Sequence, residues 1–108
     1  AKRIVEEQYT DESLSRESVA PSVGLTPSYF GKLFKQETGM NFADYLTDYR
    51  IEKAKNLLNT THKNISEIAL EVGFNSQSYF TYQFKRRVEK APTEFRADAR
   101  KKQPSLKI

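Results

Sequence analysis

The longest regular alternation of apolar and polar positions runs from Phe42 to Asn59. Apolar residues recur there every three or four positions, which places them on one stripe of a helix: Phe42, Tyr45, Leu46, Tyr49, Ala54, Leu57 and Leu58. Asn41 precedes the pattern and can accept a hydrogen bond from a free N–H at the start of the helix. Neither Pro nor Gly interrupts the stretch. We predict one long helix over 42–59 that acts as a rigid link between its two flanks.

Shorter helical patterns precede this link. Residues 1–9 form a weak amphipathic segment. A helix over 16–23, capped by Ser15, is expected to bury Val19, Ala20 and Val23 and to be distorted by Pro21, since proline removes a backbone donor. After a turn at Gly24, Thr26 and Pro27 are typical of a helix start and predict a helix over 27–38 that ends at Gly39. Its apolar side is expected to carry Phe30, Leu33 and Phe34, together with Glu37.

The segment after the link repeats this order. A loop is expected over 60–63, and Asn64 with Glu67 resembles a capping box for a helix over 65–72. A turn at Gly73 leads to a helix over 77–88, capped by Ser76, with its phenylalanines in the core. A last short helix begins at Pro92, and residues 101–108 have the composition of a disordered tail.

The two flanks are copies of one pattern. Val19-Ala20-x-x-Val23-Gly24-Leu25 recurs 49 residues later as Ile68-Ala69-x-x-Val72-Gly73-Phe74, and Tyr29-Phe30-x-x-x-Phe34-Lys35 recurs 50 residues later as Tyr79-Phe80-x-x-x-Phe84-Lys85. Each copy is a short helix, a turn with Gly and a second helix, as in a helix-turn-helix. We call 16–38 the first unit and 65–88 the second unit. The predicted fold is all-α, with about seven helices: a first helix-turn-helix subdomain over 1–40, a linker helix over 41–59, a second subdomain over 60–100 and a basic tail over 101–108.

Charge and composition limit the kinds of partner and activity that this chain can have. The 108 residues carry a net charge of +4, and basic residues concentrate after Lys85, which favours a polyanionic partner. There is no Cys, so disulfides and thiolate metal sites are excluded, and His62 has no second histidine with which to share a metal. No apolar run approaches the ~18 residues of a membrane helix. With no nucleophile constellation, phosphate loop or cofactor motif, we expect neither enzymatic activity nor a cofactor.

Duplex DNA fits this arrangement. The second helix of each unit can enter a major groove of DNA, because the groove is ~12 Å wide and admits a helix. A linker of 18 residues spans about 27 Å, which is compatible with groove contacts one duplex turn apart, ~34 Å. The helices 27–38 and 77–88 would then read successive major grooves. The alternative is an all-helical protein-interaction module that reads no bases, for which the 12% aromatic residues would supply an interface.

The chain resembles the DNA-binding domain of the AraC/XylS family of bacterial transcription regulators. The resemblance covers about 5–96 and rests most on residues 65–74, ISEIALEVGF, followed by Ser76, Tyr79-Phe80, Phe84-Lys85, Pro92 and Phe95-Arg96. It implies seven helices, two helix-turn-helix units and operator binding that regulates transcription in the cytoplasm. It also implies double-stranded DNA as partner, RNA polymerase as a further candidate partner, and a separate N-terminal sensor or receiver domain.

Site residues follow by matching positions to this family. The base-reading candidates are Ser28, Gly31, Lys32, Gln77, Ser78, Thr81 and Tyr82. Lysine can donate to guanine and glutamine to adenine, so Lys32 and Gln77 lead this set. The phosphate candidates are Tyr29, Lys35, Asn64, Lys85 and Arg86, and helix capping is the competing role for Asn64.

Several positions depart from the family pattern. Arg16 and Pro21 are unusual in the first unit, Gln83 replaces an apolar residue, and Glu89 replaces a glycine. Gly31 either lets DNA approach the helix closely or is merely tolerated, because a glycine inside a helix costs ~1 kcal/mol relative to alanine.

Overall fold

The computed structural model describes residues 2–101, which form helices and their connections and no strand. The all-α prediction is confirmed. In chain order the elements are α1 (Lys2–Gln8), α2 (Arg16–Val19), the 3-10 turn η1 (Ala20–Val23), α3 (Pro27–Thr38), α4 (Phe42–Thr60), α5 (Ile65–Glu71), α6 (Gln77–Val88) and α7 (Pro92–Lys101).

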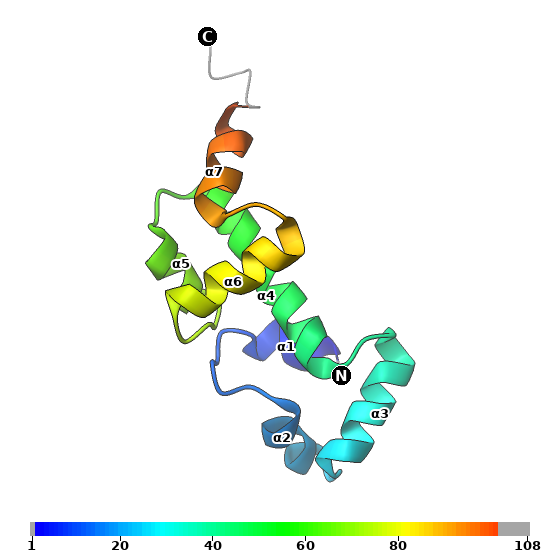
Figure 1. The fold of residues 1–108 in the computed structure, drawn as a ribbon. Coiled ribbons are helices and arrows are strands. Elements are labelled where there is room, and N and C mark those ends of the chain that lie inside the picture. Colours follow the sequence, from blue (N-terminus) through cyan, green and yellow to red (C-terminus); the bar gives the residue numbers. More distant parts are fainter. Residues whose placement is uncertain (1, 102–108) are drawn as a thin grey trace.

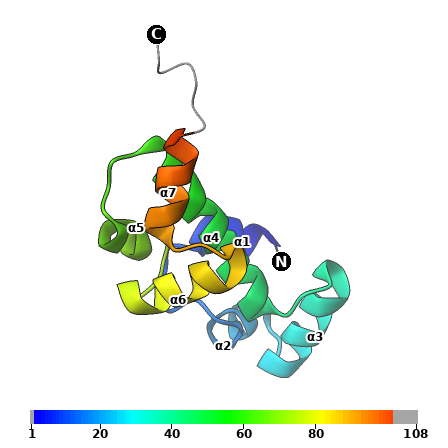
Figure 2. The ribbon, with the colours of Figure 1, turned by 45° about the horizontal axis from the view of Figure 1, so that its top comes forward.

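The long helix α4 runs through the middle of an elongated molecule, 56 × 24 × 22 Å (Figure 1). Helices α2 and α3 lie at one end of α4, while α5, α6 and α7 surround its other half. The turned view in Figure 2 places α6 in front of α4 and keeps α3 at the far end. The two second helices of the repeat are therefore separated along the linker, as the sequence pattern predicts.

Local capping explains why α3 and α6 have the predicted bounds. The Thr26 hydroxyl accepts a hydrogen bond from the Tyr29 N–H at 3.2 Å, and the Ser76 hydroxyl accepts one from the Tyr79 N–H at 3.2 Å. Each bond satisfies a donor that has no partner within the helix. Both helices end where the backbone turns left-handed, at Gly39 with φ 80° and at Glu89 with φ 68°. Because these signals are local, they can be recognised in the sequence.

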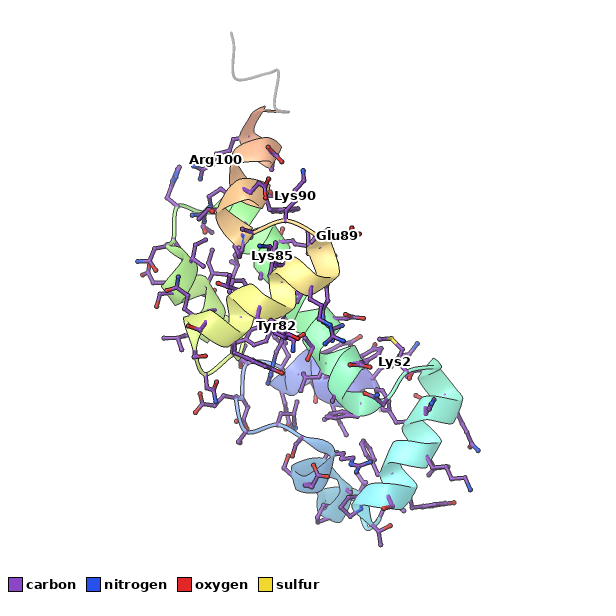
Figure 3. All side chains as sticks on the ribbon, viewed as in Figure 1. Lys2, Tyr82, Lys85, Glu89, Lys90 and Arg100 are labelled. Carbon is purple, nitrogen blue, oxygen red and sulfur yellow. The ribbon has the colours of Figure 1, made fainter. Side chains whose placement is uncertain are left out.

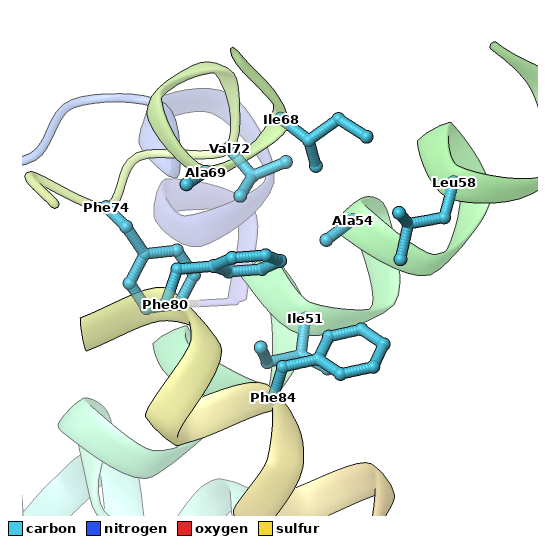
Figure 4. Close-up of a cluster of buried hydrophobic side chains, with 9 residues drawn as sticks. All are labelled: Ile51, Ala54, Leu58, Ile68, Ala69, Val72, Phe74, Phe80 and Phe84. Atoms are coloured by element: carbon cyan, nitrogen blue, oxygen red, sulfur yellow. The ribbon is translucent and has the colours of Figure 1, made fainter. Parts of the chain in front are cut away.

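Two hydrophobic cores share α4. The first half of α4 closes a core with α1, α2 and α3, built on Val5, Val19, Phe30, Phe34, Phe42 and Leu46. The second half closes another core with α5 and α6. Figure 4 shows this cluster, in which Phe80 and Phe84 of α6 lie against Ile51, Ala54 and Leu58 of α4 and Ile68 and Val72 at the end of α5. The linker helix is thus a structural part of both cores as well as a spacer.

Some predicted bounds were wrong by a residue or two. Thr60, expected in a loop, is the last residue of α4, and Val72, expected inside a helix, is the C-cap of α5. Lys101, expected to begin the tail, ends α7; the remaining tail, 102–108, lies outside the described residues. The distortion expected at Pro21 is confirmed, since the helix there tightens into the 3-10 turn η1.

The prediction that Val23 is buried was wrong. Val23 is 49% exposed, whereas its counterpart in the second unit, Val72, is 1% exposed. The cause is tertiary: a methyl group on Gly73 would lie 2.2 Å from the Tyr9 carbonyl oxygen, so the end of α1 covers the second turn. A methyl group on Gly24 would meet nothing within 4 Å, so the first turn is uncovered. Leu33, also expected in the core, is 38% exposed beside it.

Among the helices formed by residues 2–101, none combines the length and apolarity that a membrane span would require.

Candidate nucleic-acid interface

The predicted site residues of the first unit lie on the outer side of α3. Phe30 and Phe34 point into the core and are 4% and 1% exposed, and this fixes the opposite face toward solvent. On that face Ser28, Tyr29, Lys32 and Lys35 are exposed, and Gly31 is partly covered. Since positions three and four apart are neighbours on a helix, Ser28, Gly31, Lys32 and Lys35 form one continuous stripe.

Helix α6 presents the matching stripe in the second unit. Phe80 and Phe84 are fully buried, and Gln77, Ser78, Tyr82, Lys85 and Arg86 are exposed, with Thr81 partly covered. Figure 3 shows Tyr82 and Lys85 along α6, with Glu89 just after its end. Tyr82 is 58% exposed, so its ring and hydroxyl are accessible on this stripe.

The cations on these stripes are available for a partner. Lys32, Lys35, Lys85 and Arg86 form no ion pair with another described residue. Other cations are already paired. Lys63 donates to Glu71, a bond that raises the pKa of the lysine, and Lys90 donates to Asp98 with the same effect on its pKa.

Asn64 is the predicted phosphate residue with a clear structural role. Its side-chain oxygen accepts from the Glu67 N–H at 2.8 Å, and Glu67 in return accepts from the Asn64 N–H at 2.9 Å. This is the capping box that the sequence indicated. Asn64 is also exposed, so it remains accessible to a partner while it caps α5.

A polar row along α6 was not recognised from the sequence. Gln83 is only 6% exposed; its amide donates to the Tyr79 hydroxyl at 2.9 Å, and its oxygen accepts from Arg87 Nε at 3.2 Å. Arg87 continues the row to α4, where it pairs with Asp48 and, at 3.3 Å, with Asp44. This row explains why Gln83 departs from the apolar family pattern. It attaches the second reading helix to the half of α4 that belongs to the first core.

Arg50 was also missed, because it interrupts an apolar stripe and reads as a surface residue. It is 7% exposed, and its Nε and Nη2 donate to the carbonyl oxygens of Tyr9 and Asp11, both at 2.8 Å. Its guanidinium lies 5.7 Å from the ring centre of Phe74, and burial lowers the pKa of the arginine. Arg50 therefore fastens the segment after α1 to α4, and its guanidinium lies against the turn of the second unit.

Arg96 of α7 performs a similar role at the other end of α4. Its Nε donates to the Leu58 carbonyl at 3.1 Å and its Nη2 donates to the Thr61 carbonyl at 3.3 Å. These are carbonyl groups that the end of a helix leaves without an intrahelical donor. Arg100 Nη2 donates to His62 Nδ1 at 3.2 Å. Residues 2–101 contain no group of three or more side chains suited to a metal ion.

Comparison with known proteins identifies the family. Residues 19–98 match the family model described as a helix-turn-helix domain, which covers most of the first unit, the linker and the whole second unit. The chain is 36% identical to the arabinose operon regulatory protein of Escherichia coli K12 over 102 residues, which is 94% of this chain and 35% of that protein. The chain belongs to the AraC-type helix-turn-helix family.

Solved structures agree with this AraC-type membership. The C-terminal domain of the two-component response regulator yesN from Fusobacterium nucleatum superposes with a TM-score of 0.86 at 38% identity, covering 88% of this chain and 92% of that one. The DNA-binding domain of AdpA, solved in complex with a target DNA, has the same fold, with a TM-score of 0.87 at 24% identity over 95% of this chain and 91% of that one. This AraC-type chain spans about a third of the length of the arabinose operon regulatory proteins that it matches.

Proposed function

We propose that this chain binds double-stranded DNA in a sequence-specific manner and thereby regulates transcription. The observation that carries the proposal is the pair of stripes on α3 and α6. In each unit the second helix of a helix-turn-helix buries its phenylalanines and turns a polar, basic face outward. Membership of the AraC-type family and the likeness to the arabinose operon regulatory protein support the same function.

Dimensions support contact with two grooves. Successive insertions into one side of B-DNA are ~34 Å apart. A molecule whose longest axis is 56 Å, with α3 near one end and α6 beside the other half of α4, has room for that separation. We therefore propose that a first subdomain, the linker helix α4 and a second subdomain place α3 and α6 in successive major grooves.

Roles are proposed by side-chain chemistry. Ser28, Lys32, Gln77, Ser78, Thr81 and Tyr82 would face base edges, and Gly31, which has no side chain, lies on the same stripe of α3 between Ser28 and Lys35. Tyr29, Lys35, Asn64, Lys85 and Arg86 would contact phosphates, which position a protein on the duplex without reading its sequence. The function is one of binding, without a catalytic step.

Selection from a random pool of duplex DNA, read by gel retardation, tests this function. We expect the retained sequences to contain two short conserved elements about 10 base pairs apart. With about six phosphate contacts, log affinity should fall with log salt at a slope near −5. A pool that yields no common sequence, or affinity that does not depend on salt, would overturn the proposal.

Three variants separate the proposed roles. Lys32→Ala and Gln77→Ala should each relax base preference within one of the two elements, by about 1–3 kcal/mol of discrimination. Arg86→Ala should weaken all sequences alike and reduce the salt slope by about 1. Lys32→Ala and Gln77→Ala act as controls for each other. Each should change base preference only in the DNA element that its own helix contacts and leave the preference in the other element unchanged.

The alternative is a protein-interaction module. It is favoured by the apolar recess that Val23, Leu33, Ile4 and Leu25 line in the first unit. The volume of this recess, about 210 Å³, is below the usual range for ligand pockets. The basic stripes on α3 and α6 lie on a different part of the units and have no role in this alternative.

Further partners follow from the family relationship. We propose that a sensor or receiver domain precedes this domain in the full-length protein, because the related arabinose operon regulatory protein is about three times as long. We propose RNA polymerase as the partner through which the DNA-bound protein regulates transcription. We also propose that binding occurs in the cytoplasm. Co-purification of RNA polymerase with the DNA-bound domain, compared with the domain alone, tests the partner.

A further inference from the structure

Among the differences between the two units, two concern matched positions that face each other in the first unit. Arg16, the first residue of α2, corresponds to Ile65, the first residue of α5, at the repeat offset of 49. Gly31 on α3 corresponds to Thr81 on α6 at the offset of 50. At the first of these positions the second unit has the apolar Ile65 where the first unit has Arg16. At the other position α6 carries the side chain of Thr81, whereas α3 has Gly31 and therefore no side chain.

The structure shows that these two differences belong together. A methyl group on Gly31 would lie 3.1 Å from Nη1 and 3.7 Å from Cδ of Arg16, so the arginine lies over the glycine. The guanidinium therefore occupies the part of the α3 stripe where α6 carries Thr81. Ile65, by contrast, packs against the second core. Gly31, which was ambiguous in the sequence, provides the space for Arg16.

The surroundings of Arg16 are concave and positively charged. Arg16, Gly31, Lys32 and Lys35 line an open recess of about 510 Å³ together with the start of α4. Arg16 Nε donates to Glu17 at 2.9 Å, which holds the side chain while both terminal nitrogens stay outside this ion pair. The side chain remains 49% exposed. The two lysines form no ion pair with a described residue, so three cations meet in one hollow.

We propose that Arg16 is a DNA-backbone contact of the first unit. This inference rests on the proposed DNA binding. The guanidinium, seated over Gly31, binds a phosphate beside the groove that α3 enters, with Lys35 on the same phosphate ridge and Lys32 left to face the bases. The first helix of a helix-turn-helix crosses the DNA backbone, which is where an arginine at the start of α2 would meet it. A guanidinium can donate two parallel hydrogen bonds to one phosphate, which a lysine cannot do.

The test uses Arg16→Gln with the DNA selected by the unaltered protein. A single phosphate contact contributes about 0.9 to the salt slope, so the slope should become shallower by about that amount. Affinity near 150 mM salt should fall roughly three- to ten-fold for every duplex alike, because phosphates carry no sequence information. Arg3→Gln, which removes the same charge from an exposed position on α1, is the matched control and should leave the slope and the base preference unchanged.

A second arm tests the seat on Gly31. Gly31→Thr copies the second unit and places side-chain atoms where Arg16 lies, so it should weaken binding in the unaltered protein and much less in the Arg16→Gln background. An equal loss in both backgrounds would show that DNA meets Gly31 directly and would overturn the seat. Thermal unfolding followed by circular dichroism checks that each variant folds.

The outcomes separate this inference from the function on which it rests. If the unaltered protein selects no sequence, the proposed function and the phosphate contact fail together. If it selects one, and Arg16→Gln has the original slope and affinity, the phosphate contact alone is wrong. A changed base preference in the element bound by α3, with an unchanged slope, would mean that Arg16 reads bases and would also overturn the proposal.

Discussion

Replacing Arg50 by methionine tests how the segment after α1 is held against α4. The change keeps a long unbranched side chain but removes both donors that bind the carbonyl oxygens of Tyr9 and Asp11. Hydrogen bonds from a charged group contribute about 1.5–3 kcal/mol each, so their loss amounts to about 3–6 kcal/mol. Because the 7% exposed guanidinium also carries a desolvation cost, the net loss is smaller, and we expect about 2–4 kcal/mol.

The expected loss is a large part of the stability of a domain of this size, for which about 5–15 kcal/mol is typical. Urea unfolding followed by circular dichroism at 222 nm measures it. With a slope of about 1–2 kcal/mol per molar urea, the midpoint should fall by roughly 1–4 M. Arg50→Lys keeps the charge but can reach only one carbonyl well, so it should fall between the two proteins.

Arg86→Met is the matched control, since Arg86 is exposed on α6 and should change stability by no more than about 0.5 kcal/mol. If Arg50→Met is as stable as this control, the two hydrogen bonds do not stabilise the packing of the segment after α1 against α4, and the stabilising role assigned to Arg50 is wrong.

Two further predictions concern helix ends, and a third concerns the loop between α1 and α2. Glu89 and Gly39 end the matched helices with φ of 68° and 80°, a backbone conformation that favours glycine. Glu89→Gly should therefore stabilise the fold by about 0.5–1 kcal/mol, and Gly39→Ala should destabilise it by a similar amount. If both variants raise the urea midpoint, or both lower it, this reasoning is contradicted. Asn64→Asp keeps a good N-cap, so it should leave stability unchanged and weaken DNA binding in gel retardation, while unchanged binding would limit Asn64 to capping. The Ser13 hydroxyl, and to a lesser extent the Ser13 backbone N–H, donates a hydrogen bond to Asp11 and lowers the pKa of its carboxyl. The stabilisation from these bonds is present above the ordinary pKa near 4 and is lost as pH falls through the lower pKa of the folded state. NMR titration should show a higher pKa for Asp11 in Ser13→Ala, and an unchanged pKa would refute the assigned cause.

Most of the candidate interface was predictable because its signals are local. The phenylalanines at positions 30, 34, 80 and 84 orient both reading helices, and the caps at Thr26 and Ser76 set where they begin. Once those are known, the outward stripes follow from helical spacing. The repeat offset then relates each residue of one unit to its counterpart in the other.

Contacts between elements distant in sequence were not predictable. Arg50 and Arg87 read as ordinary surface cations, yet both lie against elements about forty residues away. The same holds for Gln83, whose partners Tyr79 and Arg87 make sense only once Arg87 reaches α4. No spacing rule predicts such pairs, because they depend on how the helices are packed.

The sequence by itself determined seven helices, their caps and the duplication, because hydrogen bonds within a helix and apolar periodicity involve residues only a few positions apart. Tertiary structure decided which matched positions became different. The end of α1 covers the turn at Gly73 and leaves that at Gly24 open, so Val72 is buried and Val23 is not. The tertiary structure also brings Arg16 over Gly31, since the approach of α2 to α3 depends on packing across the whole first core.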